Sequence, residues 1–406
     1  MTFIVIFLVI TVYSVVNSLF IPRPLTEDGR LNFTGLSKKY GYKAEEHSVV
    51  TEDGYILGLF HIPGKRKPPV LLLHGILDSA DTFIIRGNKS LAITLANRGY
   101  DVWAGNGRGN PYSRRHTKLN PDTDPSFWDF SFHEHGYYDL AAITDYILKA
   151  TGEAGLQSIG HSEGTTDHFV LASRRPEYND KFKIFIALAP VAFLKPLLTI
   201  SQLGPILSDL FKNMGTEETF PDNSIITPFL RLLCSQDFLS YEICFLWSTF
   251  YFTGFDTKRL ERDFIKIIIG HYPNHTSRKN LRHSNQLQLS KRFCEYDYGP
   301  AENLKRYGYM VPPDYNLREV KTKIALLIGE NDPLARIKDN EILRSVLPHV
   351  VSYHIMEDKR WSHIDFNWGN DINITLFPLL RHSIHVTETE KKSAYINVWD
   401  IIRWIF

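Results

Sequence analysis

The sequence LQSIGHSEGTT at residues 156–166 decides the fold, because it predicts a strand, a sharp turn and a helix in succession. Its first four residues suit a short buried strand, and residues 165–174 suit a helix. Gly160 and Gly164 permit a strained turn that lifts the hydroxyl of Ser162 clear of a sheet. An incidental loop is the alternative for so short a pattern, but its place between strand and helix favours a nucleophilic serine.

Strand and helix patterns alternate on both sides of this turn. The chain has 406 residues, of which 43% are hydrophobic, so it can bury the core of one large domain with insertions. The alternation predicts an α/β fold with a mostly parallel sheet and helices on both of its faces. We expect strands at 70–73, 100–104, 156–159, 183–189 and 323–329, helices at 89–98 and 137–150, and a hairpin at 41–62.

Between residues 191 and 320 the alternation stops and aromatic side chains become frequent. We expect a mostly helical cap or lid, inserted into the sheet domain; the alternative is a second domain with its own core. The C-terminal tail either lies in a membrane interface or docks on the protein's own surface. The expected divisions are 1–18 as a signal peptide, 19–190 and 321–385 as the two parts of the sheet domain, 191–320 as the cap and 386–406 as the tail.

A serine hydroxyl needs a base to take its proton, and the base needs a carboxylate to orient it. We expect the acid to be Asp332, because it follows the strand at 323–329 and sites on such sheets lie at the carboxyl ends of strands. His363, further along the chain, is the expected base. Glu330 is the main rival for the acid, and the other nearby alternatives are Asp339, His354 and Asp365.

The tetrahedral intermediate of an acyl transfer also needs hydrogen-bond donors for its oxyanion. One expected donor is the backbone N–H of Glu163, directly after the nucleophile. The other is the backbone N–H of Ile76, in the loop that follows the strand at 70–73.

The chain resembles the acid lipase family, the gastric and lysosomal acid lipases and their invertebrate relatives within the α/β-hydrolase superfamily. The resemblance covers most of the chain, and the order of its motifs makes it specific. The matching segments are YGY at 40–42, TEDGYIL at 51–57, LHGILDS at 73–79, DVWAGN at 101–106, RGN at 108–110, SRRH at 113–116, the serine turn with its two threonines, NDPLA at 331–335 and HIDF at 363–366.

This resemblance implies an α/β-hydrolase with nucleophile Ser162, acid Asp332, base His363 and oxyanion donors Ile76 and Glu163, under a lid that covers an apolar acyl pocket. It implies a lipase that hydrolyses triacylglycerols or sterol esters at a lipid–water interface through an acyl-enzyme, without cofactor or metal. The alternatives are an esterase for small soluble esters and a non-catalytic lipid-binding or storage protein on the same fold.

Two features depart from the family. The residue after the nucleophile is usually Gln, and here it is Glu163. An anion near a developing oxyanion raises the barrier, whereas a protonated Glu resembles Gln, so we hypothesise that Glu163 favours activity in acid unless its side chain points elsewhere. Cys234 and Cys244 resemble the family's disulfide, whereas Cys294 has no counterpart; the alternative is three buried thiols.

The N-terminus predicts export. Residues 1–18 contain an apolar run of about fourteen residues and end at a small residue, Ser18, which is typical of a secretory signal peptide. The run is short for a membrane span, so no stable transmembrane segment is expected after cleavage; an uncleaved signal anchor is the alternative. Together with four sequons, it predicts a secreted or lysosomal glycoprotein. The sequons begin at Asn32, Asn88, Asn274 and Asn373.

Charge and histidine spacing exclude other classes. The formal charge is +1, so no basic stripe indicates nucleic-acid binding. His133 and His135 are two residues apart and would point to different faces of a helix. His271 and His275 have helical spacing, but Pro273 lies between them, so we expect no metal site. The sequence gives no oligomeric state.

Overall fold

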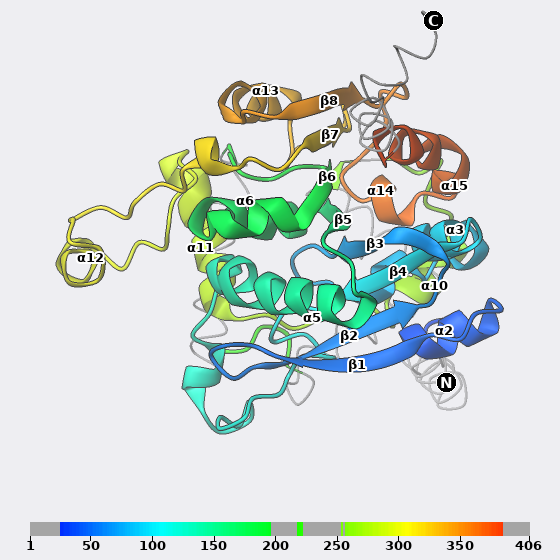
Figure 1. The fold of residues 1–406 in the computed structure, drawn as a ribbon, viewed down its shortest axis with the longest axis horizontal. Coiled ribbons are helices and arrows are strands. Elements are labelled where there is room, and N and C mark those ends of the chain that lie inside the picture. The colour runs from blue at the N-terminus through cyan, green and yellow to red at the C-terminus, as the bar shows by residue number, and fades with distance from the viewer. Residues whose placement is uncertain (1–24, 196–216, 222–252, 255, 385–406) are drawn as a thin grey trace, which may run out of the picture.

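The computed structural model describes residues 25–195, 217–221, 253, 254 and 256–384, and these contain one eight-stranded sheet. In chain order the strands are β1 (Glu45–Val50), β2 (Ile56–Ile62), β3 (Arg66–Leu73), β4 (Tyr100–Gly105), β5 (Leu156–His161), β6 (Phe182–Leu188), β7 (Ile324–Ile328) and β8 (Val350–Ile355). Their order across the sheet is β1-β2-β4-β3-β5-β6-β7-β8 (Figure 1). The first two strands pair antiparallel, β2 meets β4 antiparallel, and all pairs from β4 to β8 are parallel.

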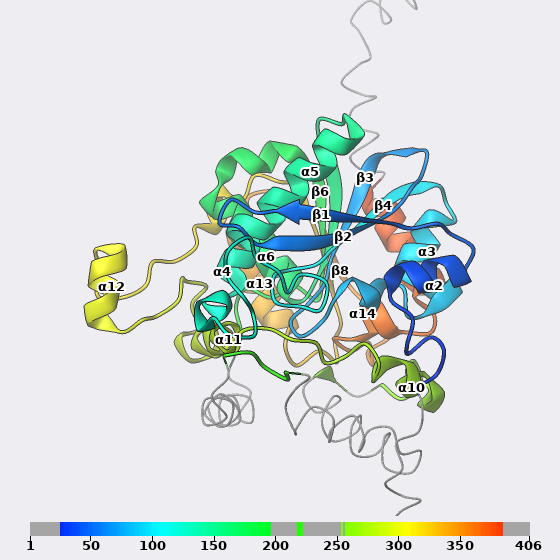
Figure 2. The same cartoon turned by 90° about the horizontal axis from the view of Figure 1, so that it is seen from below.

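Helices cover both faces of the sheet, as expected. Helices α5 and α6 lie on one face, and α2, α3 and α14 lie on the other (Figure 2). The helices are α2 (Phe33–Lys39), α3 (Leu91–Ala96), α4 (Phe132–Glu134), α5 (Ala141–Thr151), α6 (Glu163–Arg174), α10 (Ile265–Ile268), α11 (Arg278–Ser290), α12 (Pro300–Tyr307), α13 (Ile337–Val346), α14 (Asp365–Trp368) and α15 (Ile372–Thr375). A π-helical turn, His135–Leu140, joins α4 to α5.

The central strands read as continuous apolar runs because they are covered on both faces. Every residue of β4, β5 and β7 is buried, and so are the last five residues of β3. This burial fixes the sheet as a rigid platform, and the loops at the carboxyl ends of its parallel strands can then hold side chains in place.

The expected α/β architecture is confirmed, including the hairpin and the strands at 70–73, 100–104, 156–159, 183–189 and 323–329. Helix α6 starts two residues before the expected position, directly after Ser162. Strand β8 was not expected. It lies at the sheet edge with a mixed burial pattern, so its sequence lacks the uniform apolar run of the central strands.

Several expectations concern residues outside those that the structure describes. They include the signal peptide at 1–18, most of the cap at 191–320 before residue 256, Cys234 and Cys244, and the tail at 386–406. Among the described residues, none of the helices combines the length and the apolar character that a bilayer crossing requires.

Candidate active site

Ser162 lies in the turn between β5 and α6. Its backbone adopts φ 52° and ψ −120°, a positive φ that residues with side chains rarely adopt. Glycine is required at 164, because a Cβ there would lie 2.6 Å from the carbonyl oxygen of Leu73 and 2.7 Å from that of His74. A Cβ at Gly160 would lie 2.9 Å from the carbonyl oxygen of Gly164. The two glycines therefore let the strained serine turn pack against the end of β3.

We expect Gly164→Ala to lower the free energy of unfolding by about 3 kcal/mol, because the added methyl overlaps two backbone carbonyl oxygens that cannot rotate away. Gly107→Ala is the matched control, since its Cβ would meet nothing closer than the His135 ring at 3.6 Å. Urea denaturation of both variants and the wild type measures the difference. Equal stabilities of the two variants would contradict the close approach at the serine turn.

The structure brings Ser162, His363 and Asp332 into one hydrogen-bonded line. The Nε2 atom of His363 lies 2.8 Å from Ser162 Oγ, and its Nδ1 atom lies 2.7 Å from Asp332 Oδ2. All three residues are buried. Asp332 is fixed from the other side, because its Oδ1 accepts 2.8 Å hydrogen bonds from the backbone N–H groups of Leu334 and Ala335.

The backbone N–H and carbonyl of His363 are both hydrogen-bonded. Its N–H donates to the carbonyl of Thr253 at 2.8 Å, and its own carbonyl accepts a 2.8 Å hydrogen bond from Nε2 of His161. Burial lowers the pKa of His161 to about 3, so this imidazole is neutral at physiological pH. His161, one residue before the nucleophile, therefore ties the serine turn to the loop that carries the base.

The rival residues do not join this line. Glu330 is exposed, and Asp339 pairs with the guanidinium of Arg336 at 2.6 Å. Asp365 accepts a hydrogen bond from the backbone N–H of Ser362, and burial raises the pKa of its carboxyl to about 7. His354 lies within β8.

A pocket opens beside Ser162 and His363. Ile76 lines this pocket, and Glu163 is the first residue of α6, where backbone N–H groups have no partner within the helix. Both expected oxyanion donors therefore flank the serine. Half of the lining residues are apolar or aromatic: Gly75, Ile76, Tyr272, Leu334, Ile364 and Trp368. The polar ones are Asp78, His161, Ser162, Thr253, His363 and Asn367. Burial raises the pKa of Asp78 to about 7, so its carboxyl is neutral in acid.

The loop that carries Ile76 is anchored from a distant segment. Leu77 adopts a positive φ of 58°, and its carbonyl oxygen accepts a 2.7 Å hydrogen bond from the backbone N–H of Asn274. The loop therefore has a fixed conformation before any substrate arrives.

Comparison with known proteins places this site in a family. The profile described as "alpha/beta hydrolase fold" matches residues 68–366, and the "partial alpha/beta-hydrolase lipase region" matches residues 33–87. Lipase 1 of Drosophila melanogaster is 38% identical over 354 residues, covering 87% of this chain and 79% of the relative. Human gastric triacylglycerol lipase is 38% identical over 360 residues, covering 86% and 89%. The chain belongs to the acid lipase family.

This acid lipase family member is also similar in fold to proteins of known structure. A soluble variant of monoglyceride lipase from Saccharomyces cerevisiae superposes with a TM-score of 0.53 at 15% identity, covering 86% of this chain and 98% of the yeast chain. At that identity the likeness shows the α/β-hydrolase fold alone.

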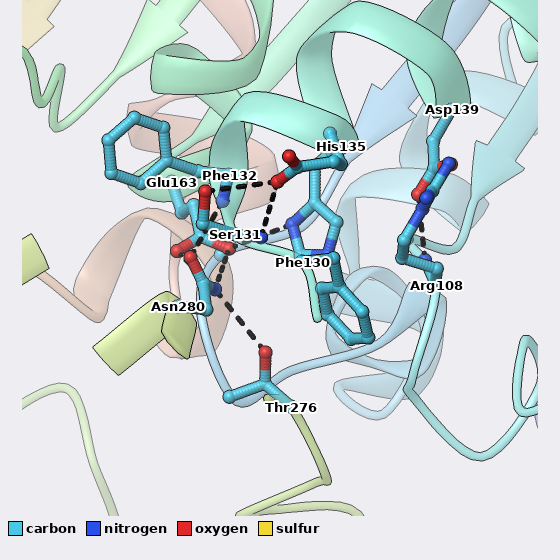
Figure 3. A network of polar contacts seen from close by, with 12 residues as sticks. Arg108, Phe130, Ser131, Phe132, His135, Asp139, Glu163, Thr276 and Asn280 are labelled. Atoms are coloured by element: carbon cyan, nitrogen blue, oxygen red, sulfur yellow. Dashed lines mark hydrogen bonds and ion pairs between the residues drawn. The ribbon is translucent and has the colours of Figure 1, made fainter. Parts of the chain in front are cut away.

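The side chain of Glu163, where the acid lipase family usually has Gln, points into a buried polar network (Figure 3). Asn280 Nδ2, from α11, donates to both carboxylate oxygens at 3.0 and 2.9 Å. Nδ1 of His135 lies 3.3 Å from Oε1 of Glu163. Asn280 is itself fixed, because its Oδ1 accepts a 2.7 Å hydrogen bond from the backbone N–H of Phe132. These contacts fix the side chain of Glu163, the first residue of α6.

His135 can supply the positive charge that faces Glu163 in this network. Burial lowers the pKa of its imidazole, but the hydrogen bond and charge of Glu163 outweigh burial and raise the pKa above its ordinary value. Burial first, and then the charges of Glu163 and Asp139, raise the pKa of Asp167 well above its ordinary range. Arg108 pairs with Asp139 at 2.6 Å and neutralises that carboxylate. Sequence reasoning missed Asn280 and His135, because their contacts with Glu163 join distant segments.

The described sequons differ in exposure. Asn32 and Asn88 are exposed and Asn373 is half-buried, so glycosylation there stays a prediction. Asn274 is buried, and its Nδ2, the atom that an N-glycan modifies, donates a 2.7 Å hydrogen bond to the carbonyl of His271. Burial and this hydrogen bond oppose the attachment of a glycan to Asn274, so we no longer expect modification there.

The structure also places the remaining cysteine and histidine candidates. Cys294 is a buried thiol, and burial raises its pKa. His271 lies 2.9 Å from Asp81, and His275 lies 3.2 Å from Glu218. The two imidazoles therefore pair with different carboxylates rather than with a shared ligand.

Proposed function

We propose that this chain hydrolyses carboxylic esters of neutral lipids, triacylglycerols or sterol esters, with Ser162 as nucleophile, His363 as base and Asp332 as the orienting acid. The observation that supports the proposal is the buried line of hydrogen bonds, 2.8 Å from Ser162 to His363 and 2.7 Å from His363 to Asp332. This is the arrangement that activates a serine for acyl transfer.

In the proposed reaction Ser162 Oγ attacks the ester carbonyl while Nε2 of His363 takes its proton. The carboxylate of Asp332 holds the ring through Nδ1 and stabilises the imidazolium. The backbone N–H groups of Ile76 and Glu163 receive the oxyanion, and losing one such donor typically costs ~3–4 kcal/mol. The alcohol leaves with the proton from His363, and a water molecule then attacks the acyl-enzyme with the same residue as base. Side chains and water account for every proton, so the proposed reaction needs no metal or cofactor.

The lining of the pocket supports an acyl chain as substrate. Apolar surface from Ile76, Leu334, Ile364 and Trp368 adjoins the serine and would favour a hydrocarbon chain over a charged group. We further propose that residues 191–320, rich in aromatic residues, cover this pocket and contact the lipid–water interface. Relatives named as triacylglycerol lipases support the same substrate class.

A substrate panel tests the proposal. The purified full chain should hydrolyse a tributyrin emulsion faster than a monomeric short-chain ester at equal ester concentration, at both acid and neutral pH. Preference for the monomeric ester would favour a soluble-ester esterase. Binding of both without turnover would favour a lipid-binding or storage role.

Export is part of the proposal. We propose that residues 1–18 are removed as a signal peptide and that the mature chain is secreted or delivered to lysosomes. N-terminal sequencing of the protein recovered from culture medium should begin after Ser18, and an intact Met1 would point to the signal anchor instead.

We expect Glu163→Gln to change the pH dependence of activity between about pH 5 and pH 8, with the variant relatively more active than the wild type at the higher pH. In the wild type the raised pKa of His135 keeps its ion pair with Glu163 intact below the ordinary histidine range, near 6.5, and the pair is lost as pH rises through the raised value. The Glu163 side chain, one residue from Ser162, then loses its cationic partner, while Asn280 still donates to both of its oxygens. An uncompensated interaction of ~1.4 kcal/mol would change the rate about tenfold.

The measurement is the ratio of kcat/KM at pH 8 to that at pH 5 for wild type and variant. Glu341→Gln, an exposed carboxylate on α13, is the matched control and should follow the wild type. Superimposable profiles for Glu163→Gln and the wild type would remove any role for this side chain in the pH dependence.

A further inference from the structure

Three side chains of types that can ligate a metal share one face of the hairpin formed by β1 and β2. Glu45 lies directly opposite His61 in the antiparallel register, and His47 follows Glu45 by two residues. Because side chains alternate along a strand, Glu45 and His47 point to the same face, and the opposed His61 joins them there. The hairpin lies at one edge of the sheet, where these side chains are partly accessible (Figure 1).

The possible ligand atoms of Glu45, His47 and His61 lie close together. Nδ1 of His61 lies 3.3 Å from Oε2 of Glu45, and Nε2 of His47 lies 3.6 Å from the same oxygen. All three donor atoms lie within 4.8 Å of one another. Nε2 of His47 is also buried and has no hydrogen-bond partner among the described residues.

The second nitrogen of each imidazole is already occupied. Nδ1 of His47 lies 3.0 Å from the hydroxyl of Tyr146, and Nε2 of His61 lies 2.7 Å from Oδ1 of Asp101. The His61 ring also stacks on Trp103 with centroids 3.8 Å apart. Metal-ligating histidines use one nitrogen for the ion and bond the other to a carboxylate or similar group, which fixes the orientation of the ring. Both rings here are held in that way, with their remaining nitrogens aimed at the carboxylate of Glu45.

We propose that Glu45, His47 and His61 form a binding site for a zinc ion. Two imidazoles and one carboxylate are a ligand set that proteins use for Zn²⁺, with water in the fourth position. Ligand distances of 2.0–2.1 Å in a tetrahedron place neighbouring ligand atoms about 3.3 Å apart. The two separations from Glu45 Oε2, 3.3 and 3.6 Å, are close to that spacing, and the two imidazole nitrogens lie within 4.8 Å of each other.

The site would act on the scaffold rather than on the ester. Strands β4 and β3 separate β2 from β5, whose end carries the serine turn. An ion held by β1 and β2 would cross-link the edge strand to its neighbour and oppose fraying of the hairpin. Zinc should therefore raise the melting temperature, because a ligand that binds only the folded chain stabilises it. The alternative is that Glu45 only forms ion pairs with the two histidines and the three residues bind no metal.

The test uses the purified full chain, stripped of metal by chelation and dialysed. Isothermal titration with zinc chloride at neutral pH should give one zinc per chain, and zinc should raise the melting temperature. His47→Gln and His61→Gln should each weaken zinc binding at least tenfold and abolish the thermal shift. The control is His349→Gln, an exposed histidine before β8 at the opposite edge, which should bind zinc as the wild type does.

A further variant separates a loss of zinc binding from a loss of folding. Tyr146→Phe leaves all three ligands in place but removes the hydroxyl that orients His47, and partners of this kind are worth roughly 10- to 100-fold in metal affinity. Circular dichroism verifies that each variant is folded. Absence of saturable zinc binding in the wild type, or equal affinity in the wild type and both ligand variants, would overturn the proposal.

Discussion

Ser162→Ala should lower kcat for ester hydrolysis by roughly 10⁶-fold, the largest effect that we expect from a single substitution. The variant removes the only atom that can form the acyl-enzyme in the proposed reaction, while leaving the pocket and the base in place. Loss of the hydroxyl also removes the hydrogen bond to His363, so the remaining rate would come from binding and the oxyanion donors alone.

Two measurements separate this loss of chemistry from a loss of folding. Kinetics on a soluble ester give kcat, and a fluorophosphonate probe should label the wild type but not the variant. Ser126→Ala changes an exposed serine and should retain both labelling and activity. Labelling of a folded Ser162→Ala protein would mean that another residue is the nucleophile, and the proposed function would fail with it.

Asp332→Asn should lower kcat by roughly 10⁴-fold with a much smaller change in KM. The carboxylate accepts the Nδ1 proton of His363 at 2.7 Å and so leaves Nε2 free to take the serine proton. An asparagine amide can donate to Nδ1 instead, which places the imidazole in the wrong tautomer for a base. The two backbone hydrogen bonds to Oδ1 can persist in the variant, so the loop should keep its conformation.

The rival carboxylate supplies the control. Glu330 lies two residues before Asp332 and is exposed, so Glu330→Gln should behave as the wild type. A large loss in Glu330→Gln with normal activity in Asp332→Asn would reverse the assignment of the acid. Near-ultraviolet circular dichroism of both variants verifies that their packing is unchanged.

The local part of this site could be predicted from the sequence. The serine turn has a short-range signature, and a parallel sheet brings the carboxyl ends of its strands to one edge, so Asp332 after β7 had to lie near Ser162 after β5. The motif order of a known family then placed His363. These inferences needed no knowledge of side-chain contacts.

Contacts between distant segments could not be predicted. Asn280 reaches Glu163 across 117 positions, and the carboxylate had no visible partner in the sequence. The burial of Asn274 could not be predicted from its sequon either, because it involves distant segments, as the hydrogen bond from its N–H to the carbonyl of Leu77 illustrates. The proposed zinc ligands could not be predicted either, because they lie on two strands and only the strand register brings them together.

The buried imidazole of His161 affects the stability of the folded chain in acid. Folded, it titrates near pH 3, whereas in an unfolded chain it would titrate near 6.5. Between those values only the unfolded chain takes up this proton, so acidification pulls the equilibrium toward unfolding through the residue that braces the serine turn. At acid pH this one imidazole would therefore lower the free energy of unfolding, and the loss would grow as the pH falls toward the folded-state value.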